Sequence, residues 1–244
     1  MRTMLTFSNR TLKEMLRDPL TIFFGLGFPL VVLLLLSLIQ SNIPVEMFEL
    51  HHLTPGITVF GLSFMTLFSG QLVSHDRGSS FITRLYTTPL KAHEFIMGYT
   101  LPILPLCLAQ SVICYIAAFI LGLKFDVNII WAILMNLVPS LFYVSFGLLC
   151  GSTMNEKQVG GICGALLTNL SAWLSGVWFD ISMLGKAVSA FANALPFIHA
   201  VELERAIVLG DMASAMPHLL WVAGYAIVFM VLAILLFLRQ MKRQ

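Results

Sequence analysis

The chain has few charged residues for its length. Of its 244 residues, 14 are Lys or Arg and 12 are Asp or Glu, so 11% are charged. Soluble domains average about 25%. Hydrophobic residues make up 58% of the chain, and its mean hydropathy is +0.90. A water-soluble fold could not hide this much apolar surface, which excludes an ordinary soluble domain.

Cysteine is also scarce, and its placement excludes a disulfide framework. All four thiols lie inside or at the edge of apolar stretches, where a buried thiol acts as a small hydrophobe: Cys107, Cys114, Cys150 and Cys163. The pair His51 and His52 has no further ligand nearby, so we expect neither a metal site nor a catalytic centre.

The sequence lacks a phosphate-binding loop of the Gly-x-x-x-x-Gly-Lys-Ser/Thr type. The nearest segment, Gly185-Lys186-Ala187, has neither the leading glycine nor the hydroxyl. Any ATP, with its magnesium, is therefore expected on a partner chain, and we expect no cofactor on this one. A cleavable leader is not expected either, because the first 19 residues are charged and lack an apolar core.

Long apolar runs are plentiful. Each approaches the roughly 20 residues that cross a hydrocarbon core of about 30 Å. The predicted spans are 20–40, 54–73, 95–123, 127–151, 159–179 and 217–238. We therefore predict a single all-α membrane domain over residues 1–244 with six transmembrane helices.

Most basic residues fall on one side of the predicted membrane spans, and this bias predicts the orientation of the chain. With the N-terminus in the cytoplasm, eleven of the 14 basic residues fall inside, and three fall outside: Lys124, Lys186 and Arg205. Such a bias predicts that both termini are cytoplasmic. It fits a multi-pass protein of a prokaryotic inner membrane. The net charge of +2 gives nucleic-acid binding no support.

Residues 1–18 have the pattern of an amphipathic interfacial helix. One side carries Leu5, Ser8, Leu12, Met15 and Leu16, and the other carries basic residues. We expect the apolar stripe to face lipid, the basic residues to face anionic headgroups, and the helix to break at Asp18-Pro19. A solvated leader is the alternative.

The outer segment 180–216 is too apolar for an ordinary loop. Residues 181–195 have a helical pattern, Pro196 interrupts it, and 199–209 resume it up to Gly210. Neither piece is long enough to cross, so we predict a re-entrant hairpin in the outer leaflet, with simple surface helices as the alternative.

Two sets of polar residues lie in apolar surroundings. Glu202, Glu204 and Arg205 near the outer surface are expected to pair among themselves or with headgroups, although buried charges there are candidates for function. A second set either lines a pathway or, as we favour, forms bonds between helices: Gln110, Asn136, Thr168, Asn169 and Ser171.

The cytoplasmic loop at 74–94 carries most of the functional signal. The sequence predicts a short helix from Ser79 to Tyr86, with Gly78 before it and Thr88-Pro89 ending it. A compact helix between two spans is suited to transmitting an applied force to both of them. A solvated loop is the alternative.

This chain resembles the membrane subunits of type-2 ABC exporters, the permease family that includes daunorubicin-type drug exporters and polysaccharide exporters. The motifs that carry the likeness occur in the family's order: an N-terminal helix ending in Arg17-Asp18-Pro19, then Gly78-Ser79, Leu85, Thr88-Pro89 and Gly98, then Leu195-Pro196-Phe197-Ile198-His199 followed by Arg205 and Gly210.

The resemblance implies that 76–91 is a coupling helix that docks on a separate ATP-binding subunit, present in two copies. The coupling residues would be Asp76, Arg77, Gly78, Ser79, Arg84, Leu85, Thr88, Pro89 and Lys91, with a smaller second contact at Asn155, Glu156 and Lys157. The motif before the last span would include Pro196, His199, Glu202, Glu204, Arg205 and Gly210. A second permease chain, the same or similar, would complete the pathway.

The leading hypothesis is thus an ATP-driven exporter subunit that moves an amphipathic or lipid-like molecule outward and is not itself an enzyme. A drug or antibiotic is the leading cargo. An ion-coupled secondary transporter is the alternative, disfavoured because no acidic residue falls mid-span. An intramembrane enzyme is disfavoured because no histidine lies in a span near Ser175 or Glu202.

Overall fold

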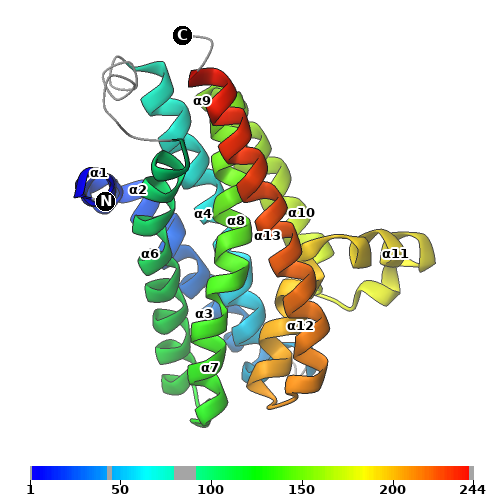
Figure 1. The fold of residues 1–244 in the computed structure, drawn as a ribbon. Coiled ribbons are helices and arrows are strands. Elements are labelled where there is room, and N and C mark those ends of the chain that lie inside the picture. The colour runs from blue at the N-terminus through cyan, green and yellow to red at the C-terminus, as the bar shows by residue number, and fades with distance from the viewer. Residues whose placement is uncertain (1, 43–45, 80–91, 242–244) are drawn as a thin grey trace.

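The computed structural model describes residues 2–42, 46–79 and 92–241, and within these ranges the chain is helical without strands. In chain order the elements are α1 (Arg2–Arg17), α2 (Pro19–Ile22), the π-helix η1 (Phe23–Gly27), α3 (Phe28–Asn42), the 3-10 turn η2 (Glu46–Phe48), α4 (Leu50–Gly78), α6 (Ala92–Ile120), α7 (Val127–Met135), α8 (Leu137–Thr153), α9 (Glu156–Val159), the π-helix η3 (Gly160–Leu167), α10 (Thr168–Leu174), the 3-10 turn η4 (Ile181–Leu184), α11 (Lys186–Ala194), α12 (Pro196–Val208) and α13 (Met212–Met241). The long helices run side by side (Figure 1). The predicted all-α membrane fold is confirmed.

Five helices in the described part of the chain are long and apolar enough to cross a membrane. They are Pro19–Asn42, Leu50–Gly78, His93–Ile120, Val127–Thr153 and Met212–Arg239, and they contain five of the six predicted spans or most of each. Several begin just after a residue whose side chain caps the helix. Asp126, for example, accepts a hydrogen bond from the backbone nitrogen of Asn128 and so caps α7 after the short turn that follows α6.

The predicted span at 159–179 is different in the structure. Its helix runs from Glu156 to Leu174 in three parts, α9, η3 and α10, and residues 175–179 are not helical. Gly176 takes a φ of 73°, a left-handed conformation that ends the helix and that glycine adopts without strain. The helix is therefore shorter at its outer end than expected, and its crossing of the membrane stays a prediction.

Helix α4 is the central element of the bundle. In its most apolar stretch 89% of the residues are buried, whereas the figure is 17% for both Pro19–Asn42 and Met212–Arg239. Small residues bring α4 against α8, because a Cβ added at Gly147 would overlap Ser69 Oγ and the carbonyl oxygen of Thr66. Movement of α4 without α8 would break this close backbone contact.

Helix α1 lies across the bundle and is seen nearly end-on beside α6 (Figure 1). The stripe expected to face lipid is divided, because its residues Ser8 and Met15 are buried against protein. Phe7, Thr11 and Met15 are buried, while Leu5 and Leu16 are 55% and 50% exposed. Phe7 packs edge-on against the ring of Tyr99, with the two ring centroids 4.8 Å apart. One side of α1 therefore contacts protein, while the other side is exposed and can contact lipid. The predicted break is confirmed, because Asp18 caps α2 and Pro19 is its first residue.

The outer segment forms two helices of unlike surroundings. Helix α11 projects sideways from the bundle, whereas α12 runs along α13 (Figure 1). The predicted interruption at Pro196 is confirmed, because α11 ends at Ala194 and Pro196 begins α12, three residues before the expected 199. The reason is that proline lacks the amide hydrogen that a first helical position does not need. The end at Gly210 is confirmed, where φ is 77°.

Candidate coupling site

The last turn of α4 leads directly into the predicted coupling segment. Asp76, Arg77 and Gly78 belong to α4, so they do not form part of a separate cytoplasmic helix as expected. Ser79 ends α4 in an extended conformation, with its hydroxyl donating to the carbonyl of Asp76 at 2.9 Å. The remaining predicted coupling residues lie outside the described residues: Arg84, Leu85, Thr88, Pro89 and Lys91.

Asp76 is a nearly buried carboxylate, 1% exposed, with partners from two other elements. Arg10 of α1 donates to both carboxylate oxygens, at 3.0 and 3.2 Å, and the Tyr99 hydroxyl of α6 donates at 2.9 Å. A paired Arg–carboxylate fork of this kind is among the stronger and more directional polar contacts. It fixes α1 to the C-terminal end of α4 and to the first part of α6.

The surroundings of Arg10 also favour its charged form. Partial burial opposes the charged form, but the hydrogen bonds to Asp76 and the nearby charges of Asp76 and Glu14 outweigh it, so the pKa of Arg10 is raised. Glu14 lies one turn further along α1, with a carboxylate oxygen 2.9 Å from Nη2 of Arg10.

Arg77 points to a different element. Its Nη1 donates to the carbonyls of Gly151 and Met154, at 2.7 and 3.2 Å. These carbonyls lie at the end of α8, where a helix leaves its last carbonyls without internal partners. A cation at a helix C-terminus also complements the helix dipole. Arg77 therefore attaches the end of α8 to the end of α4.

His75 reaches the turn between α8 and α9. Its Nδ1 is 2.8 Å from a carboxylate oxygen of Glu156, and both side chains are more than half exposed. In the same turn Asn155 and Gln158 form a reciprocal cap at the start of α9. Lys157 is exposed. Of the predicted second contact, Glu156 thus meets α4, Asn155 organises the turn and Lys157 faces solvent.

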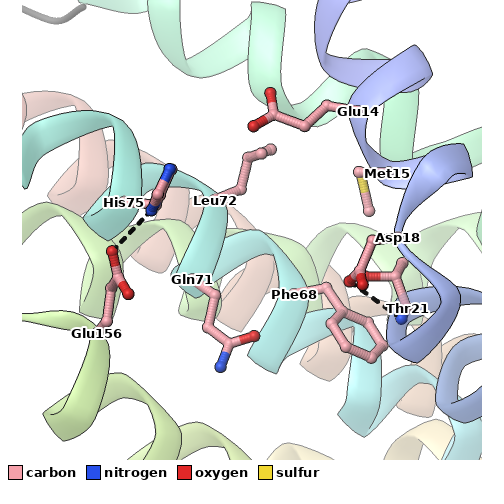
Figure 2. Close-up of a pocket in the computed structure, with 9 residues that line it drawn as sticks. All are labelled: Glu14, Met15, Asp18, Thr21, Phe68, Gln71, Leu72, His75 and Glu156. Atoms are coloured by element: carbon pink, nitrogen blue, oxygen red, sulfur yellow. Dashed lines mark hydrogen bonds and ion pairs between the residues drawn. The ribbon is translucent and has the colours of Figure 1, made fainter. Parts of the chain in front are cut away.

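A pocket of about 360 Å³ opens between these elements (Figure 2). One wall comes from α1 and α2, a second from α4 and a third from α9. The lining residues are Glu14, Met15, Asp18, Thr21, Phe68, Gln71, Leu72, His75 and Glu156. The carboxylate of Asp18 is already used, because it accepts hydrogen bonds from the backbone of Leu20 and Thr21. The pocket is therefore a space that α1, α2, α4 and α9 surround without filling.

The mid-bundle polar residues mostly bond within the protein. Asn136 donates to Ser111 and so joins α8 to α6, and Ser171 shares a 2.6 Å hydrogen bond with the Tyr143 hydroxyl of α8. Gln110 is buried with its amide close to Gly61 of α4.

Three of the mid-bundle polar residues do not bond between helices. Gln110 donates to the Cys114 sulfur of its own helix at 3.7 Å. Thr168 and Asn169 donate to the carbonyls of Cys163 and Ala165 in the preceding turn. For these two the favoured bond to another helix is not what the structure shows, because a carbonyl of their own helix lies within reach.

Of the three charged residues on α12, Glu202 and Arg205 pair with each other, and Glu204 has no hydrogen-bond partner among the described residues. Arg205 is 6% exposed, pairs with Glu202 at 3.0 Å, and donates to the carbonyls of His52 and Gly176. Glu204 is fully buried, and neither carboxylate oxygen has a hydrogen-bond partner among the described residues. The expected mutual pairing holds for Glu202 and Arg205 and is wrong for Glu204, which faces the opposite side of α12.

His199 lies between α12 and α13. Its Nε2 must donate to the carbonyl of Asn193 at 2.9 Å, which leaves Nδ1 as an acceptor in the neutral ring. His218 Nδ1, 2.8 Å away, then donates to it. No group of three or more possible metal ligands comes together in residues 2–42, 46–79 and 92–241.

Sequence reasoning does not identify the two residues that bind the Asp76 carboxylate, Arg10 and Tyr99. Arg10 was assigned to lipid headgroups, and Tyr99 had no assigned role. No periodicity marks either one, because their partner Asp76 is 66 and 23 residues away along the chain. Only the fold brings them together.

Comparison with known protein families supplies the identity. A family model described as ABC-2 type transporter matches residues 3–209, which is most of the chain. The chain belongs to the ABC-2 type transporter family. A search of curated proteins found no match. As an ABC-2 protein the chain is a membrane permease of an ABC transporter, and permeases of this family normally work with an ABC ATP-binding subunit.

Proposed function

We propose that this permease exports an amphipathic or lipid-like molecule, with a drug or antibiotic as the leading candidate, using ATP hydrolysed on a separate subunit. The chain would carry no ATPase site of its own, and ATP and magnesium would bind to two copies of the partner. Both termini would lie in the cytoplasm of a prokaryote, with the protein in its inner membrane. The charge bias of the loops supports this orientation.

One observation carries the coupling role. His75, Asp76 and Arg77 contact four other elements, α9, α1, α6 and α8, immediately before the segment expected to dock on the ATPase. Force applied to that segment therefore reaches these elements through direct contacts. ATP can shift the permease only if its partner grips this region differently in two states.

A second permease chain is supported by the unused small-residue surface of η3. Gly164 contacts Leu67, but a Cβ added at Gly160 or Gly161 would meet nothing within 4 Å. Small residues that no helix of the same chain covers allow close approach by a helix of another chain. We propose that two permease chains and two ATPase chains form the exporter.

The test is transport by a defined complex. The permease is purified with its ATPase subunit, placed in liposomes and assayed for ATP-dependent movement of the fluorescent amphiphile Hoechst 33342. Replacing Arg84 or Leu85 by alanine is expected to weaken ATPase binding and transport together. Lys124→Ala, in the turn between α6 and α7 at the opposite end, is the matched control and should change neither. Full coupling in the Arg84 and Leu85 variants would sink the proposed docking site.

Glu204 is the structural feature that favours the alternative function, an ion-coupled secondary transporter. It is a buried carboxyl without a partner, the kind of group that ion-coupled transporters use. Transport by the chain without any ATPase subunit, abolished by Glu204→Gln, would favour that alternative. Transport that requires the ATPase and survives Glu204→Gln is the outcome we expect.

A further inference from the structure

Two of the four cysteines meet in the fold. Cys150 lies near the end of α8 and Cys163 lies in the π-helical segment η3, and their side chains are 4% and 0% exposed. With Val159 they form a small cluster of buried side chains that is separate from the main core. Within this cluster the two thiols are hydrogen-bonding partners. The fold therefore makes a dithiol from two different helices.

The other two cysteines are arranged differently. Cys107 and Cys114 lie seven positions apart on α6 and belong to the main core, and the Cys114 sulfur accepts a hydrogen bond from Gln110. Seven residues of a helix span about 10 Å along its axis, because each residue adds about 1.5 Å. A disulfide requires its two Cα atoms to lie within about 7 Å. Cys107 and Cys114 are therefore internal controls for a reaction that needs a neighbouring thiol.

The dithiol lies in a closely packed part of the bundle. Gly151, next to Cys150, lies against the backbone of α4, because a Cβ added there would overlap the carbonyl oxygen of Gly70. Val159 also packs on Gly70 and leaves no room for a Cβ between them. The carbonyl of Gly151 accepts a hydrogen bond from Arg77 at 2.7 Å. Since close-packed interiors transmit small displacements, a change in the distance between the two sulfur atoms alters the contacts of α4 with its neighbours.

We propose that Cys150 and Cys163 are an oxidation site, at which a peroxide converts the two thiols into a disulfide that joins α8 covalently to η3. The new bond brings the two sulfur atoms to about 2 Å from each other. It therefore displaces the packing around Gly151, which Arg77 links to the last turn of α4. Oxidation slows ATP-driven transport, and reduction restores it. This effect on transport rests on the proposed function, whereas the formation of the disulfide does not.

Hydrogen peroxide is a sufficient oxidant, and the reaction balances. The Cys163 thiol is placed to donate to the Cys150 sulfur, and such a hydrogen bond favours the thiolate, which is the nucleophilic form. The Cys150 sulfur attacks one peroxide oxygen, the O–O bond breaks, and the thiol proton leaves with the released hydroxide as water. The Cys163 sulfur then attacks the sulfenic acid on Cys150, the S–O bond breaks, and the Cys163 proton leaves with hydroxide as a second water. Two thiols have then lost two electrons and two protons, and the peroxide has become two waters.

The first measurement asks whether the disulfide forms. The permease is purified in detergent without its ATPase partner, treated with hydrogen peroxide, denatured and alkylated with a mass-tagged maleimide that counts free thiols. The count should fall from the four thiols of the sequence to two, and a reducing phosphine should restore all four. Mass spectrometry of the digested protein should find the peptide of Cys150 linked to that of Cys163. No loss of thiols in the folded protein, or a disulfide that includes Cys107 or Cys114, overturns the inference.

Serine variants assign the reaction to the pair. Cys150→Ser and Cys163→Ser should each prevent the disulfide, because the neighbouring thiol is gone. Cys107→Ser and Cys114→Ser are the matched controls, and both should still form it. A disulfide in Cys150→Ser would contradict the assignment. If a serine variant does not fold, the linked peptides of the parent protein decide the point without it.

The second measurement asks what the disulfide does. The complex with its ATPase subunit is placed in liposomes, and ATP-dependent movement of Hoechst 33342 is followed before oxidation, after oxidation and after reduction. The parent and Cys107→Ser should lose most of their transport on oxidation and regain it on reduction, whereas Cys150→Ser should be insensitive. Full transport by the oxidised parent, or equal loss in Cys150→Ser, would contradict the effect on coupling. Absence of transport in the reduced parent is instead a failure of the proposed function, and the disulfide measurement stands apart from it.

Discussion

Because the buried polar residues of this protein are shielded from water, their hydrogen-bond partners within the protein determine their roles. Asp76 and Arg205 are almost fully buried, and the side chain of each makes three hydrogen bonds with described residues. Glu204 is equally buried and has none. Since a buried polar group is costly unless it is hydrogen-bonded, Asp76 and Arg205 serve as links between elements, whereas burial raises the pKa of Glu204 and so favours its neutral form.

Neutral Glu204 leads to a prediction with a definite sign. Burial raises the pKa of Glu204, on α12 outside the five spanning helices, well above its ordinary value. Its stabilising contribution is therefore complete below the unfolded pKa of about 4.3 and is lost as pH rises towards the folded pKa. Glu204→Gln should be more stable than the parent at neutral pH, and the difference should shrink at pH 4.

The matched comparison is Arg205→Gln, which leaves several acceptors on neighbouring elements without a donor. It should lower the free energy of unfolding by about 2–3 kcal/mol at neutral pH. Both variants are measured by denaturant titration in detergent micelles. If Glu204→Gln destabilises as much as Arg205→Gln, then Glu204 has a partner and the assignment as a neutral orphan is wrong.

A glycine contact gives the second prediction at this scale. A Cβ at Gly147 would overlap Ser69 Oγ and the carbonyl of Thr66, and backbone can move away only by separating α8 from α4. Gly147→Ala should therefore cost about 1–3 kcal/mol. In α13, a Cβ added at Gly224 would meet no described atom within 4 Å apart from its own helix backbone, so the same change should be neutral or gain up to about 1 kcal/mol. Equal melting temperatures in detergent would contradict the close contact.

At the scale of elements, the helices begin and end where short-range chemistry allows. Asp18, Asp126 and Asp180 each accept hydrogen bonds from backbone nitrogens at the start of a helical segment. Gly176 and Gly210 end segments with positive φ. Which side of each element is buried follows from neighbours and not from these local signals. Helix α1 shows this, because its packed side includes Phe7 and Thr11 and its exposed side includes Leu5 and Leu16.

The start of α13 provides a pH prediction for an element. Asp211 accepts hydrogen bonds from the hydroxyl and backbone nitrogen of Ser214, and these bonds lower the pKa of Asp211. A carboxyl with a depressed pKa contributes stability above its unfolded pKa, about 3.9, and loses it as pH falls through the folded value. We expect the carboxyl carbon of Asp211 to titrate in NMR below the ordinary aspartate range.

The control for this prediction is Asp211→Asn. Its side-chain carbonyl still caps the helix but does not titrate, so the first turn of α13 should remain folded at acid pH. An Asp211 titration at or above the ordinary value, or acid fraying of the first turn in Asp211→Asn, would show that the hydrogen bonds to Ser214 are not what holds the turn.

At the scale of the whole molecule, the bundle has two unlike ends. The C-terminal end of α13 and the start of α9 lie at one end, and the turns joining α6 to α7 and α12 to α13 lie at the other (Figure 1). The first end carries the residues around Asp76 and most of the basic residues that the structure describes. The second carries the turn after α12, and Arg205 joins α12 to the start of α4 and the bend after α10.

This arrangement predicts the outcome of two-sided labelling. A cysteine placed at Lys124 should react with a membrane-impermeant maleimide in intact cells, and one placed at Lys157 should react only after permeabilisation. The native thiols are buried, so the parent protein is a low-background control. Reversed labelling would invert the proposed orientation and move the residues around Asp76 to the wrong side for an ATPase.

The sequence by itself determined that the chain is a membrane protein, where most of its helices lie and which family it belongs to. These properties depend on composition, on runs of about 20 apolar residues and on motifs that are local in the chain. For the same reason Pro196, Gly210 and the break at Asp18-Pro19 were located to within a few residues.

Only the tertiary structure decided what the apolar and charged residues touch. In a membrane protein both lipid and other helices are apolar, so a hydrophobic stripe does not say which of the two covers it. The central place of α4, the docked side of α1 and the shortened helix at 156–174 could not be read from periodicity. The partners of Asp76 lie on helices far away in the sequence, and a buried ion pair forms only where folding removes water from all of its members at once.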